Sequence, residues 1–150
     1  MKEKLDFIRL PMVVVLVFFA GNLILGATGA SYEIAKRLFS MVILQTHLAL
    51  LWAAIGRRYQ GYKIRGAINS VVMIILFSQI LIWGMTVFSY VTGMHSYFSD
   101  PVAITGNAQP ISFGVAMVAR AIGLVVNTVI AVILGAIGWA MGGLIPERKS

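Results

Sequence analysis

Apolar residues are concentrated in four long segments of this chain, which short polar connections separate. The segments cover residues 7–27, 32–55, 67–91 and 111–145. A helix of about 20 apolar residues is long enough to cross the hydrocarbon core of a bilayer. The pattern therefore predicts an all-α fold, an integral membrane bundle of four transmembrane helices, and a single transmembrane domain over residues 1–150.

Two of the four segments carry signals about their ends. The second is expected to run as one helix to Ile55, where Gly56 provides a stop. The fourth ends at Pro146 and is longer than one bilayer crossing requires. We therefore expect the fourth helix to tilt, to bend or to project from the membrane.

The composition agrees with a membrane location. Hydrophobic residues make up 59% of the chain and charged residues only 11%, whereas roughly a quarter of the residues of a soluble domain are charged. A soluble fold of this length could not cover so much apolar surface with polar side chains. Lipid is the solvent that the composition indicates, most simply the cytoplasmic membrane of a bacterium or archaeon, with the chain crossing it several times.

Basic residues flank the apolar segments and give the chain a net charge of +7. The connection at 57–66 is strongly basic, whereas the connection at 92–110 has Asp100 as its only charge. Because basic loops stay in the cytoplasm, both termini are predicted to be cytoplasmic. This places nine basic residues inside: Lys2, Lys4, Arg9, Arg57, Arg58, Lys63, Arg65, Arg148 and Lys149. Charges at segment ends suit lipid headgroups, and no nucleic-acid partner is predicted.

The fourth segment has one helical face that is small or polar along its whole length. We call it the small–polar face, and at 100° per residue it holds Ala116, Arg120, Gly123, Asn127, Ala131, Gly135, Gly138 and Gly142. Small residues three and four apart let helix backbones approach closely in lipid. Helix packing is the favoured interpretation of this face. The alternative is one wall of a narrow pathway, with Arg120 and Asn127 lining it.

Arg120 is the only charge well inside a predicted apolar run. A basic side chain near the bilayer centre costs from about 3 to 10 kcal/mol or more, so its depth decides its role. An interfacial arginine whose head reaches the headgroups is slightly favoured over a buried contact to an anion or substrate. Asp100 and Glu33 are its candidate partners.

Four other polar side chains lie in predicted spans: Asn22, Gln45, His47 and Gln79. Amides of this kind hold helices together in lipid at about 1 kcal/mol each, and packing is the favoured role. A haem with two axial histidines needs a second histidine at the depth of His47, and His95 lies at the outer edge. With no cysteine, metal cluster or catalytic constellation in view, we predict no cofactor, no metal site and no enzyme activity.

These observations favour a non-catalytic polytopic membrane protein. The first hypothesis is a subunit that forms a homo-oligomer or packs against a larger membrane protein, and the small–polar face motivates it. The alternative is a small channel or transporter with a path lined by Arg120, Asn127, His47 and Gln79. The two hypotheses differ in whether those side chains face a cavity or a protein contact.

Overall fold

The computed structural model describes residues 2–29, 32–94 and 96–144, and all the regular structure in these residues is helical. The helices are α1 (Lys2–Ala27), α2 (Tyr32–Leu38), α3 (Met41–Gln60), α4 (Ile64–Thr92), α5 (Pro101–Thr105) and α6 (Phe113–Gly142). Within the described residues, four stretches are long and apolar enough to cross a membrane: Asp6–Ala27, Tyr32–Gln60, Ile64–Thr92 and Phe113–Gly142. The predicted all-α, four-span fold class is confirmed.

The second predicted span is not one helix, and this part of the prediction was wrong. The chain leaves helical conformation at Phe39 and Ser40, which separates α2 from α3. The Ser40 hydroxyl accepts a hydrogen bond from the Ile43 backbone N–H at 3.3 Å and so caps the new helix. The interruption frees the Phe39 carbonyl, and the Asn22 side chain of α1 donates to it at 2.7 Å.

The predicted stop at Gly56 was also wrong, because α3 continues to Gln60 and Gly61 is its C-cap, and the ends of the other helices differ by a few residues. Helix α6 begins at Phe113 because the Ser112 hydroxyl caps it, accepting from the Val115 N–H. It ends at Gly142, and residue 145 and the basic residues Arg148 and Lys149 lie outside the described residues. The short helix α5 was not predicted. Its cap is Asp100, whose carboxylate accepts from two backbone N–H groups at 2.8 and 3.2 Å.

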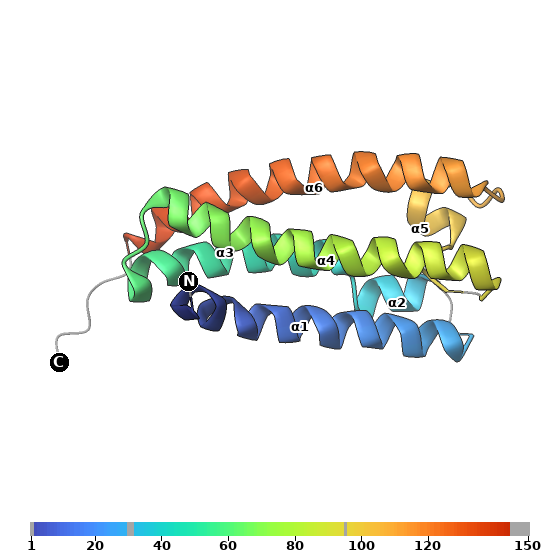
Figure 1. Ribbon diagram of the computed structural model, residues 1–150, viewed down its shortest axis with the longest axis horizontal. Helices are drawn as coiled ribbons and strands as arrows, with labels where there is room; N and C mark the ends of the chain where they lie inside the picture. The colour runs from blue at the N-terminus through green and yellow to red at the C-terminus, as the bar shows by residue number, and fades with distance from the viewer. Residues whose placement is uncertain (1, 30–31, 95, 145–150) are drawn as a thin grey trace.

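The long helices lie side by side, with α3 and α4 between α1 and α6 (Figure 1). The start of α1, the connection from α3 to α4 and the end of α6 lie at one end of the bundle (Figure 1). We call this the basic end, because Arg57, Arg58, Lys63 and Arg65 lie in or beside that connection. Helices α2 and α5 lie toward the opposite end, which we call the α5 end (Figure 1).

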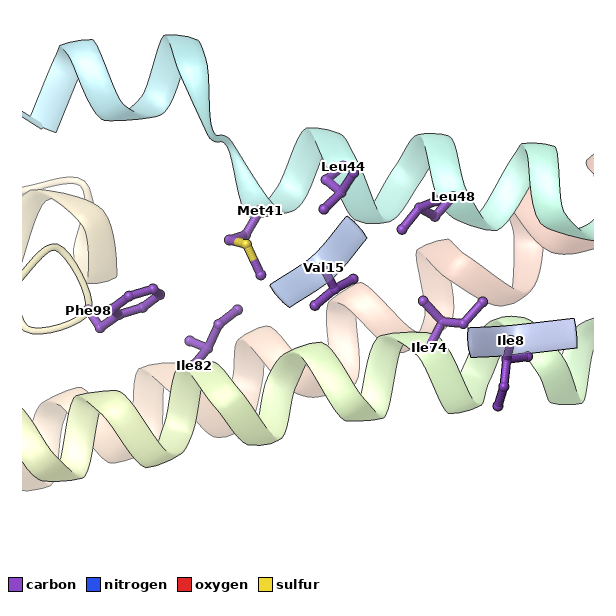
Figure 2. Packing of buried hydrophobic residues seen from close by; sticks show 8 residues of the cluster. All are labelled: Ile8, Val15, Met41, Leu44, Leu48, Ile74, Ile82 and Phe98. Carbon is purple, nitrogen blue, oxygen red and sulfur yellow. The ribbon is translucent and has the colours of Figure 1, made fainter. Parts of the chain in front are cut away.

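Two clusters of buried side chains hold the layers together. Large side chains of α1, α3 and α4, joined by Phe98, form the first cluster, which Figure 2 shows: Ile8, Val15, Met41, Leu44, Leu48, Ile74, Ile82 and Phe98. The second joins α6 to α3 and α4 through smaller side chains: Ala49, Ala53, Ala67, Val71, Ile75 and Ala131. Helix α6 therefore lies closer to its neighbours than side chains of ordinary size would allow.

The closest approach of α6 is to the backbone of α3 near the basic end. A Cβ atom added to Gly138 would collide with the carbonyl oxygen of Leu50, and one added to Gly142 would collide with that of Ala54. At Gly135 the nearest atom, in Val71, would lie 3.6 Å away, which is an ordinary contact. Two glycines of the small–polar face are thus required by close backbone contact, and the third is not.

We expect Gly138→Ala to destabilise the bundle by about 1–3 kcal/mol, because the added methyl group forces the α3 and α6 backbones apart. Gly114→Ala is the matched control, since it lies in the same helix and a Cβ there meets no atom within 4 Å. Both variants can be compared by thermal unfolding in mild detergent. A Gly138→Ala midpoint equal to that of the control would contradict the close contact.

Candidate functional site

A cavity of about 240 Å³ lies between the middle of the bundle and the α5 end. It is enclosed by α1, α2, α3, α4 and α6, together with α5 and the residues before it. Polar side chains from every one of the four spans line it. They are Asn22, Tyr32, Lys36, Ser40, Gln45, Gln79, Arg120 and Asn127, with Tyr97 from the connection before α5.

Arg120 is held in this cavity by neutral partners. Its Nε donates to the Thr86 hydroxyl at 3.2 Å, and its Nη2 donates to the Phe98 carbonyl at 2.9 Å. The Thr86 hydroxyl itself lies within hydrogen-bond distance of the Ile82 and Phe98 carbonyls. The predicted partners Asp100 and Glu33 make no ion pair with Arg120. The arginine therefore ties α6 to α4 and to Phe98 without having its charge neutralised.

Described residues use less than half of the hydrogen-bonding capacity of Arg120. A guanidinium group carries five N–H donors in a planar fork. Two of them are taken by the described partners, which leaves three on a side chain that lines the cavity. A planar group with several free donors and a full positive charge suits an oxyanion.

Asn127 lies two turns further along α6 and makes no hydrogen bond to any described residue, although its side chain lines the same cavity. At Gly123, between Arg120 and Asn127 in sequence, a Cβ atom would meet no other atom within 4 Å. The open space beside Gly123 and the unpaired amide of Asn127 lead to one conclusion about this part of α6. This part of the small–polar face borders a cavity rather than a packed helix.

The amides on the opposite wall are already bonded to one another. Gln45 donates to the Ser78 hydroxyl at 2.6 Å, and Gln79 donates to the Gln45 carbonyl oxygen at 3.3 Å. Both glutamines are buried, at 3% and 5% exposure. These hydrogen bonds join α3 to α4 along the polar wall of the cavity that faces α6.

Lys36 supplies the second positive charge of the lining. Its side chain is exposed, and it makes no ion pair or hydrogen bond with any described residue. Because an exposed residue lines the cavity, the cavity extends to the molecular surface beside α2. The charged residues among the lining residues are Lys36 and Arg120, so the lining carries positive charge and no negative charge.

Two tyrosines stand at the α5 end of the cavity. The ring centroids of Tyr32 and Tyr97 are 6.0 Å apart. Burial and the nearby Asp100 carboxylate both raise the pKa of the Tyr97 phenol. Tyr97 therefore stays a neutral phenol at neutral pH.

The predicted site residues fall into three groups. Arg120, Gly123, Asn127, Asn22, Gln45 and Gln79 line the cavity. Ala131, Gly135, Gly138 and Gly142 are buried, and the three glycines face α3 or α4 closely. His47 joins neither group, since it is exposed and its Nδ1 lies 2.8 Å from the Ile43 carbonyl of its own helix.

Sequence reasoning missed the contributions of Lys36, Tyr32 and Tyr97. The available signal was the basic pair Lys36 and Arg37 near the start of the second segment, but charges at segment ends were assigned as a group to the lipid headgroups. Only the interruption at Ser40 brings α2 over the cavity, and the apolar pattern gives no sign of that interruption. The described residues contain no group of three or more His, Asp or Glu side chains arranged to hold a metal ion.

Comparison with protein-family models, with curated proteins and with solved structures finds no match for this chain.

We expect Asn127→Cys to react with a charged, membrane-impermeant thiosulfonate, because its side chain lines a cavity that reaches the surface. The chain has no native cysteine, so every label reports the introduced one. Val125→Cys is the control, since Val125 is 62% exposed on the outer surface of the same helix, where lipid surrounds it. Thiolates form in water and not in lipid, so Asn127→Cys should react about tenfold faster or more. Equal rates would mean that water does not reach the cavity.

Proposed function

We propose that this protein is a small transporter that binds a polar solute in the cavity between its four spans. The single observation that carries the proposal is the unpaired polar lining: among the described residues, three N–H donors of Arg120 and the amide of Asn127 have no hydrogen-bond partner. Polar groups in a membrane interior are costly unless they are satisfied. A solute and its accompanying water would satisfy them.

The other half of the bundle supports a transporter over an open channel. Below the cavity, the second cluster and the glycine contacts pack α6 against α3 and α4. A solute in the cavity would meet this packed region before it reached the basic end. Passage therefore requires α6 to move relative to α3, and closely packed small residues form a contact that can separate without moving large side chains.

The subunit hypothesis loses its main motivation. Gly138 and Gly142 contact α3 of the same chain and Gly135 contacts α4, so the spacing of these glycines requires no second chain. The exposed outer surface of α6 is rich in valine and isoleucine, as lipid alone would require. A homo-oligomer or a larger membrane partner remains a prediction, as does the absence of enzyme activity.

Uptake into vesicles tests the transporter proposal. We expect reconstituted protein to carry at least one of three small polar solutes, succinate, succinamide or 1,4-diaminobutane, faster than vesicles of lipid alone. Asn127→Trp should abolish the uptake by filling the cavity, whereas Val125→Trp, on the lipid-facing surface, should retain it. The proposal fails if none of the three solutes is carried, or if both variants behave alike.

We further propose that the basic end is cytoplasmic, so that the cavity lies in the external half of the membrane. The basic connection supports this orientation, since the described residues 96–112 contain no lysine or arginine. A reporter fused within residues 57–66 should read as cytoplasmic, and one fused within residues 96–109 as external. If either reporter reads as the opposite side, the orientation is reversed.

A further inference from the structure

We infer that the solute of this cavity is a small organic acid, bound as an oxyanion by Arg120 and Lys36. The inference rests on the proposed function and narrows it to one chemical class. Four observations on the described residues lead to it: the charges of the lining, the free donors of Arg120, the amide of Asn127, and the volume.

The charges exclude a cationic solute. Both charged residues of the lining, Lys36 and Arg120, are basic. The acids Asp100 and Glu33 do not line the cavity. The Asp100 carboxylate instead caps α5. An ammonium group would meet two like charges and no carboxylate. An anion would neutralise an arginine whose present partners are both neutral.

The donor geometry favours a carboxylate over a spherical anion. The guanidinium presents a planar fork, and two parallel N–H···O bonds to a carboxylate are the contact that this fork makes best. Arg120 is fixed through Nε and Nη2 to groups of α4 and the α4–α5 connection. Its fork is therefore held in one orientation before the solute arrives, which reduces the entropy lost on binding.

The rest of the lining suits a polar second end of the solute. Asn127 offers both donors and an acceptor, and Lys36 offers a second positive charge nearer the surface. A volume of about 240 Å³ equals that of about eight liquid waters, which accommodates an acid of a few carbon atoms. A phospholipid headgroup carries an oxyanion as well, and the cavity opens to the surface beside α2, so the experiments below distinguish a soluble acid from a lipid headgroup.

Isothermal titration of the purified full-length protein in detergent tests the inference with three solutes of equal chain length. The probes are succinate, a dianion, succinamide, its neutral counterpart, and 1,4-diaminobutane, a dication. We expect succinate to bind about tenfold more tightly than succinamide or better, and the dication not to bind, because each lost charge-assisted hydrogen bond weakens binding by about that factor. Equal binding of succinate and succinamide would overturn the anion assignment while leaving the proposed function in place. Binding of none of the three would overturn both.

Two variants distinguish binding in the cavity from a general attraction of the anion to surface charge. Lys36→Gln should weaken succinate binding about twofold to fivefold and leave succinamide unaffected, because an exposed ion pair contributes only modestly to binding. It should also leave the fold unchanged, since Lys36 has no described partner. Arg37→Gln is the matched control, an exposed neighbour of equal charge that does not line the cavity. If the two variants lose the same affinity, the anion is attracted to the surface charge and not to the cavity.

Arg120→Gln should abolish succinate binding, and Arg120→Lys should recover part of it, because lysine keeps the charge and loses the fork.

Native mass spectrometry of the same proteins with added phosphatidylglycerol tests whether the bound oxyanion belongs to a lipid headgroup. Phosphatidylglycerol that wild type retains and that Lys36→Gln and Arg120→Gln both lose would assign the site to a lipid headgroup and overturn the soluble acid. Equal retention by all three proteins, with succinate binding lost, would support it.

Discussion

Close contact between the backbones of α3 and α6 is the constraint on which the rest of this bundle depends. Lipid gives no hydrophobic drive for two apolar helices to associate, so their contact rests on dispersion forces and a few polar bonds. Both contributions grow when small residues let the two backbones approach closely. At Gly138 and Gly142 there is no room for even a methyl group. The contact is also anchored at its end. Arg57 of α3 lies 3.9 Å from the centre of the Trp139 ring and donates to the Trp139 carbonyl at 3.1 Å.

The same constraint explains why the cavity lies where it does. Helix α6 is pinned to α3 near the basic end, while at the α5 end the short helix α5 contacts α6 (Figure 1). Between these two points the small–polar face continues, and its small residues, which permit close packing at one end, leave space at the other. Gly123 and Gly138 lie on one face of one helix, yet a Cβ would meet nothing at the first and backbone at the second.

Much of this fold could be predicted from the sequence, because hydrophobic length and helical periodicity are local properties. The four spans and the membership of the small–polar face both follow from them. The residues that lie opposite that face cannot be predicted in this way, because they depend on the path of α3 and α4. The break at Ser40 shows the limit clearly. Phe39 and Ser40 lie inside the predicted span of residues 32–55, and the helix ends there because Asn22, Gly21 and Phe18 of a different helix receive the freed carbonyl and the Phe39 ring. The exposure of His47 could not be predicted either, because a lone histidine does not indicate which face of its helix will be buried.

The break and the cavity are physically connected. Asn22 lines the cavity and also holds the Phe39 carbonyl, so the residue that stabilises the interrupted helix belongs to the cavity wall. Had the second span continued as one helix, the Phe39 carbonyl would have stayed in the helical ladder, and α2 would have followed the axis of α3. The interruption instead frees α2 to carry Lys36 and Tyr32 to the cavity. A broken helix at membrane depth is stable only where its freed groups find partners or water. In this protein the Asn22 amide supplies the partner, and the interruption adds a second positive charge, Lys36, to the cavity lining that contains Arg120.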